Sequence, residues 1–155
     1  MKIYLAADHA GFELKEKIKE FLVKENHEVV DCGAYTYDPN DDYPDFIAKA
    51  AKAVSIDPEN SKAVILGGSG QGEAIVANKF PNVRAVVYYG ENDSIVLLCR
   101  EHNDANVLSF GARFISEEEA LKAVRVWLTT PFSGESRHKR RIKKIGDIER
   151  KLCTK

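Results

Sequence analysis

Short apolar runs alternate with amphipathic stretches along the whole sequence. An apolar run bounded by turn residues is typical of a buried strand, whereas apolar residues three and four positions apart are typical of a helix. We expect strands at 3–7, 27–33, 62–68, 83–89 and 105–111, and helices at 12–25, 45–55, 72–80, 91–103, 116–130 and 137–152. Because strands that alternate with helices favour a parallel sheet covered on both faces, the pattern predicts an α/β chain with a five-stranded parallel sheet.

The bulk properties favour a single domain, 1–155, in which 134–152 forms a C-terminal basic helix. The net charge of −1 provides no general attraction to nucleic acid or to a membrane surface. No apolar run approaches the roughly 20 residues that span a bilayer, and the run before Asp8 is too short for a signal peptide. The three cysteines, Cys32, Cys99 and Cys153, have no metal-ligand spacing, so we expect reduced thiols and a cytoplasmic protein.

The most unusual stretch is GGSGQGE at 67–73, which follows a predicted strand and leads into a predicted helix. Such a turn presents backbone N–H groups to an anion. It is not a Walker loop, because no Gly-Lys-Ser/Thr follows, and its glycine spacing fits a dinucleotide fingerprint poorly. A tight turn alone would explain the glycines. The polar side chains of Ser69, Gln71 and Glu73 among them favour an anion-binding loop.

Further candidate residues lie at the ends of other predicted elements. Asp8 and His9 follow the strand at 3–7, although Asp8 could simply cap the next helix. His102 lies near a helix end, where it could also interact with the helix dipole. Arg137 and Arg141 are four residues apart and would share a helix face, where their guanidinium groups could grip a phosphate. The basic run around them could equally be a solvated face, and nucleic-acid binding has little support.

Six motifs occur in one order between residue 6 and about residue 142: ADHAGFELK, DCGAY, DDYPDFIAKA, GGSGQGEAIVANK, REHNDANVLSFGAR and WLTTPFSGESRHKRRI. In this ordered set the sequence resembles the B-type ribose-5-phosphate isomerases and the related galactose- and allose-6-phosphate isomerases. The resemblance implies a three-layer α/β/α Rossmann-like fold and a homodimer with shared active sites, with a tetramer as the alternative. It also implies an aldose–ketose isomerase of the pentose phosphate pathway that needs no metal or organic cofactor.

The resemblance also implies the site residues, some of them from each subunit. We hypothesise that Glu73 moves a proton between C2 and C1 of the sugar and that His102, helped by Asp8, opens the ring. Ser69 would help to hold the enediolate intermediate. The substrate-binding positions would be His9, Tyr43, Gly67, Gly68, Gly70, Gln71, Gly72, Asn103, Arg113, Arg137 and Arg141.

One departure from the family pattern concerns a catalytic cysteine, which many members carry in the glycine loop and which we expect at the position of Gly68. None of the three cysteines lies in this loop, and the sequence resembles a second branch that uses a glutamate at the position of Glu73. The alternatives are an isomerase of another sugar phosphate with six or four carbons, a non-catalytic phosphosugar-binding module, and a nucleic-acid binder.

Overall fold

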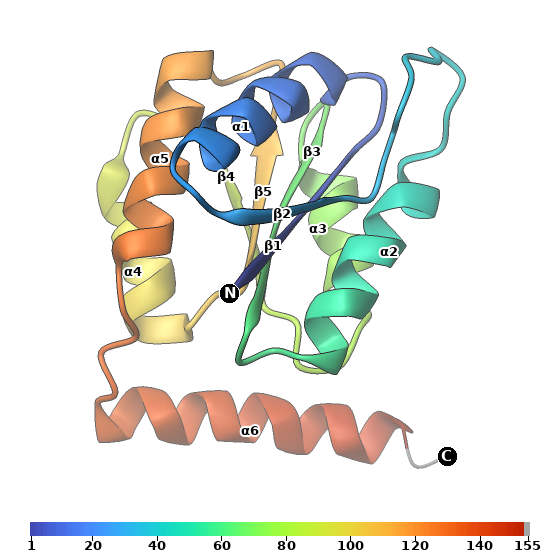
Figure 1. Ribbon diagram of the computed structural model, residues 1–155. Helices are drawn as coiled ribbons and strands as arrows, with labels where there is room; N and C mark the ends of the chain where they lie inside the picture. The colour runs from blue at the N-terminus through green and yellow to red at the C-terminus, as the bar shows by residue number, and fades with distance from the viewer. Residues whose placement is uncertain (154–155) are drawn as a thin grey trace.

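The computed structural model describes residues 1–153 and has five strands and six helices within them (Figure 1). The strands are β1 (Lys2–Ala7), β2 (Glu28–Asp31), β3 (Ser61–Gly67), β4 (Ala85–Tyr88) and β5 (Val107–Gly111). The helices are α1 (Phe12–Lys24), α2 (Tyr43–Ile56), α3 (Gln71–Ala77), α4 (Asp93–Asn103), α5 (Glu117–Thr129) and α6 (Ser136–Cys153). Every predicted element is confirmed, and β2, β4, β5 and α3 are the ones that are most clearly shorter than expected.

The strands form one parallel sheet in the order β2-β1-β3-β5-β4. Helices α1, α4 and α5 cover one face and α2 and α3 cover the other, as the three-layer prediction requires (Figure 1). Helix α6 lies apart from both layers, across the end of the sheet where the strands begin (Figure 1). The carboxyl ends of all five strands therefore meet at the edge opposite α6.

The central strand β3 fixes the layers because its side chains alternate between two cores. Val64 and Leu66 are buried with Trp127 under α1 and α5, whereas Ile65 is buried with Ile47 under α2. Full burial of such a side chain contributes about 1.5–3 kcal/mol. This alternation holds helices on both faces of the sheet, and because the strands are parallel, every loop from a strand to a helix leaves at the carboxyl edge.

Helix α5 begins with a capping box. The hydroxyl of Ser116 accepts a hydrogen bond from the Glu119 N–H at 3.3 Å, and the Ser116 N–H donates to the Glu119 carboxylate at 3.1 Å. Among residues 1–153, no helix is both long enough and apolar enough to cross a membrane.

A buried lysine ties α1 to the end of β2. The Lys15 side chain is fully buried, and its Nζ lies 2.9 Å from both carboxylate oxygens of Asp31. Burial alone would raise the pKa of Asp31, but hydrogen bonds from Lys19, Lys15 and the Gly33 N–H together lower it. This cluster anchors the start of the long loop that leads from β2 to α2.

Candidate active site

The carboxyl edge brings together four of the predicted site segments. Ala7 pairs with Leu66, and Gly67 pairs with Gly111, so the loops after β1, β3 and β5 leave the sheet at the same level. Ligands in parallel α/β folds bind at this edge. The segments are Asp8 and His9 after β1, the loop 67–73 after β3, Arg113 after β5, and Tyr43 at the start of α2.

Two glycines of the loop allow other chain segments to approach closely. Gly70 has φ of +73°, and a Cβ there would lie 2.8 Å from the carbonyl carbon of Phe110. A Cβ on Gly72 would lie 2.7 Å from Cζ of Tyr43. A larger residue at either position would therefore push the loop away from β5 or from the Tyr43 ring.

Glu73 lies directly over the backbone of Gly67. Its side chain is buried, and a Cβ on Gly67 would overlap its carboxylate. A Cβ on Gly68 would instead lie 3.3 Å from Cζ of Arg113. This geometry corrects the position expected for a loop cysteine, because a side chain that reaches the place of the Glu73 carboxylate starts at residue 67, not at 68.

Burial raises the pKa of Glu73 above its ordinary value, and the nearby carboxylate of Asp8 adds to the effect. The hydrogen bond from the Glu73 N–H opposes the shift but does not cancel it. A carboxylate with a raised pKa is a stronger base than an ordinary one, which suits it to take a proton from carbon.

Asp8 and His9 are both held in place by hydrogen bonds. The Asp8 carboxylate accepts from the N–H groups of Ala10 at 2.9 Å and Gly11 at 3.1 Å, so it orders the turn that precedes α1. The capping alternative is wrong, because Gly11 is the N-cap residue of α1 and no side chain caps this helix. Nδ1 of His9 lies 2.7 Å from Oδ1 of Asp41. Asp41 escaped the sequence reasoning because it is one of several acids in a polar loop.

Asp8, His9 and Asp41 form the one cluster within residues 1–153 whose ligand-type atoms are close enough to share a metal ion. The atoms lie within 4.8 Å of one another. The hydrogen bond between His9 and Asp41 uses Nδ1 of His9 and Oδ1 of Asp41, so these two atoms are already paired with each other.

Ser69 and Gln71 are exposed on the same loop. The Gln71 amide donates to the Tyr89 hydroxyl at 2.6 Å. Ser69 lines an open hollow of about 370 Å³ with Tyr89, Gly90 and Phe114. The Ser69 and Gln71 side chains of the loop are therefore accessible to solvent, whereas the Glu73 side chain is buried.

The remaining predicted residues lie at the opposite edge of the sheet. His102 and Asn103 end α4, which returns to the edge where the strands begin, and Arg137 and Arg141 lie on the first turns of α6. The His102 ring stacks on that of His138, with ring centroids 4.2 Å apart and planes 11° apart. The sequence reasoning missed His138 because it counted this residue only as part of a basic run.

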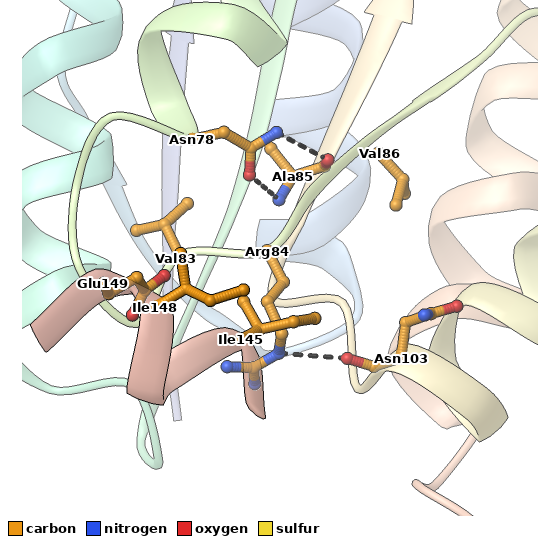
Figure 2. Close-up of a pocket in the computed structure, with 9 residues that line it drawn as sticks. All are labelled: Asn78, Val83, Arg84, Ala85, Val86, Asn103, Ile145, Ile148 and Glu149. Carbon is orange, nitrogen blue, oxygen red and sulfur yellow. Dashed lines mark hydrogen bonds between the residues drawn. The ribbon is translucent and has the colours of Figure 1, made fainter. Parts of the chain in front are cut away.

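A cleft of about 420 Å³ separates α6 from this edge (Figure 2). Ile145 and Ile148 of α6 form one wall, and Arg84 and Asn103 form part of the other. Nε of Arg84 donates to the Asn103 carbonyl oxygen at 3.0 Å, which fixes the end of α4 (Figure 2).

The predicted site residues therefore fall into two groups, which we call half-sites and which lie about 20 Å apart, since β3 spans seven residues and a strand rises roughly 3.3 Å per residue. The carboxyl half-site holds Asp8, His9, Tyr43, the loop 67–73 and Arg113. The amino half-site holds His102, Asn103, Arg137 and Arg141. No single chain brings the two together.

Comparison with known proteins identifies the family to which the chain belongs. The chain is 45% identical over 150 residues to a ribose-5-phosphate isomerase B of Mycobacterium tuberculosis strain H37Rv, covering 97% of this chain and 91% of that protein. A ribose-5-phosphate isomerase B of Mycoplasma genitalium with bound ribulose-5-phosphate superposes with a TM-score of 0.92 at 37% identity, covering 96% of each chain. The ribose-5-phosphate isomerase B of Clostridium thermocellum superposes with a TM-score of 0.91 at 41% identity, covering 98% of this chain and 99% of that one. Residues 3–145 match the Ribose/Galactose Isomerase family, and the chain belongs to that family.

Proposed function

We propose that the protein is an aldose–ketose isomerase that interconverts ribose 5-phosphate and ribulose 5-phosphate through an enediolate. The observation that carries this proposal is the buried carboxylate of Glu73 at the end of the glycine loop, with its raised pKa and its position over Gly67. It is supported by relatives that match this chain over 91% and 99% of their own length and bear this activity in their names.

Glu73 acts as the base in this proposal. It takes the proton from C2 of the open-chain aldose and returns it to C1 of the enediolate. The N–H groups of residues 68–72 and the Ser69 hydroxyl face the oxygen on which negative charge develops. Preorganised donors of this kind are each worth about 3–4 kcal/mol in the transition state.

His102 and Asp8 open the sugar ring before this step. A histidine suits the role because its ordinary pKa near 6.5 lets it donate and regain a proton at neutral pH. Arg137, Arg141 and His9 hold the phosphate, and Tyr43, Asn103 and Arg113 contact the rest of the sugar. Because the phosphate is remote from the reacting carbons, its role is to position them.

The working unit in this proposal is a homodimer. Glu73 and His102 lie at opposite edges of one sheet, so a complete site needs the carboxyl half-site of one chain and the amino half-site of another. Large apolar side chains are exposed on elements beside the edge strand β4, which suits a covered interface: Ile75 on α3, Ile95 and Leu98 on α4, and Phe114 after β5. We place the enzyme in the cytoplasm, since Cys32 and Cys99 are both free thiols.

The reaction is tested by NMR of ribose 5-phosphate in D₂O with the wild type and Glu73→Gln. The proposal expects ribulose 5-phosphate and deuterium at the exchanging carbon with the wild type only. Equal activity of both proteins would remove Glu73 as the base. If neither protein is active on ribose 5-phosphate, six-carbon and four-carbon sugar phosphates are tested as substrates.

The shared site is tested by mixing two inactive variants, Glu73→Gln and His102→Asn, after unfolding and refolding them together. A mixed dimer combines the intact Glu73 half-site of one chain with the intact His102 half-site of the other. Random pairing should restore about a quarter of the wild-type activity. Refolding each variant alone is the control, and no recovery in the mixture would place both residues in one chain's site.

A further inference from the structure

The Asp41 carboxylate is buried in the loop between β2 and α2, next to the proposed phosphate-binding residue His9. Its side chain is only 7% exposed, which is costly for a charged group unless it is paired. The loop turns at Asp38, whose carbonyl oxygen accepts from the Asp41 N–H at 3.1 Å and whose carboxylate accepts from the Asn40 N–H at 3.0 Å. This turn directs Asp41 back towards β1.

Asp41 engages His9 twice through one oxygen. Oδ1 accepts from the His9 backbone N–H at 3.1 Å and lies 2.7 Å from His9 Nδ1. A carboxylate oxygen only accepts, so Nδ1 carries the proton and Nε2 is the ring nitrogen left for a ligand. The Tyr37 and His9 rings lie nearly perpendicular, with centroids 6.2 Å apart, which further limits how the imidazole can turn.

The other oxygen, Oδ2, is buried and has no hydrogen-bond partner within residues 1–153. A buried carboxylate with one oxygen unsatisfied contributes little to stability, because its hydrogen bonds only partly offset the cost of its desolvation. The pair is better explained by what it does to His9.

We propose that Asp41 is a positioning residue that fixes the tautomer and orientation of His9 for the substrate phosphate. This inference rests on the proposed function and adds a residue to it. The hydrogen bonds between Asp41 and His9 also hold the loop that precedes Tyr43 against the end of β1. The position of this loop and the position of the proposed phosphate contact therefore depend on each other.

The test compares Asp41→Ala and Asp41→Asn with the wild type and with Asp45→Asn, an exposed acid on the first turn of α2 that serves as the matched control. Phosphate binding acts on ground state and transition state alike, so its loss raises KM rather than lowering kcat. Asp41→Ala should raise KM for ribose 5-phosphate by about tenfold or more and change kcat by less than about threefold. Asp41→Asn keeps an acceptor oxygen and should recover part of the affinity.

A second readout is independent of activity. In ¹⁵N NMR spectra of the histidine rings, the wild type should show His9 protonated at Nδ1, and Asp41→Ala should lose that signal. Assignment uses the loss of the same signal in His9→Asn, and thermal unfolding confirms that each variant is folded. An unchanged His9 spectrum or an unchanged KM in Asp41→Ala would overturn the inference. A wild type without isomerase activity would instead contradict the proposed function. The spectra would still decide whether Asp41 fixes the tautomer of His9.

Discussion

The imidazole rings of His102 and His138 are stacked face to face, 4.2 Å apart between centroids, although they come from different helices. His138 is buried, and burial, followed by the nearby His102 and Arg137, lowers its pKa. A neutral His138 can support the His102 ring without competing for its proton.

The stack predicts that His138→Ala lowers kcat for ribose 5-phosphate about tenfold, because His102 loses the surface that orients it. His138→Phe keeps a flat ring and should retain most of the activity. Steady-state kinetics of both variants provide the measurement, and equal losses in the two would point to a role for the His138 nitrogens instead.

The space over Gly67 gives a second prediction. Gly67→Ala should lower kcat by about 10²–10⁴-fold, because its Cβ would displace the Glu73 carboxylate from its place. Gly68→Ala is the matched control, since its Cβ would meet the flexible Arg113 side chain at 3.3 Å and should cost much less. If Gly67→Ala turned over substrate normally, the carboxylate would not need this position.

The pKa of Glu73 predicts how stability depends on pH. Burial raises this pKa above 4.5, so the folded chain holds the proton more tightly than the unfolded chain does. The stabilising effect of that proton is complete below the unfolded value and is lost as the pH rises through the folded value. Glu73→Gln cannot ionise, so its Tm should exceed that of the wild type at pH 7, and the difference should vanish below pH 4.5. Calorimetry across this range measures it, and a constant difference would contradict the shift.

Phosphate binding by α6 predicts that Arg137→Ala raises KM about tenfold with a smaller change in kcat. Arg140→Ala removes the same charge from an exposed position of the same helix and serves as the control. Initial rates over a range of substrate concentrations separate the two parameters. Equal effects of both variants would mean that only the overall charge of the helix matters.

Thiol reagents should leave the activity largely intact. Burial raises the pKa of Cys99 to about 11 and also raises that of Cys32, so neither forms a reactive thiolate near neutral pH. Treatment with iodoacetamide followed by an activity assay checks this. Complete loss of activity that substrate prevents would show that a cysteine works at the site.

The alternation of apolar runs and helical stretches was enough to predict all five strands, all six helices and the three layers. The loop 67–73 was correctly placed after β3 because the glycine run directly follows KAVIL. The capping box of Ser116 and Glu119 can also be predicted from the sequence, since both partners lie within one helical turn.

Contacts between distant segments could not be read in the same way. Asp41 and His9 are 32 residues apart, and no local pattern links them. Lys15 sits among exposed lysines and glutamates of α1, and only the pairing with Asp31 across the fold explains its burial. The division into half-sites depends on the return direction of α4, which places His102 far from Glu73.

The overlap between Glu73 and a side chain at residue 67 also has an evolutionary consequence. This part of the sheet edge has room for one basic group, either a carboxylate reaching over from 73 or a side chain rising from 67. A lineage that exchanges one for the other by single substitutions must pass through an ancestor with both groups colliding or with neither present. Because an intermediate of this kind has a displaced base or no base, its low activity would keep lineages with different bases apart even when the rest of their fold is the same.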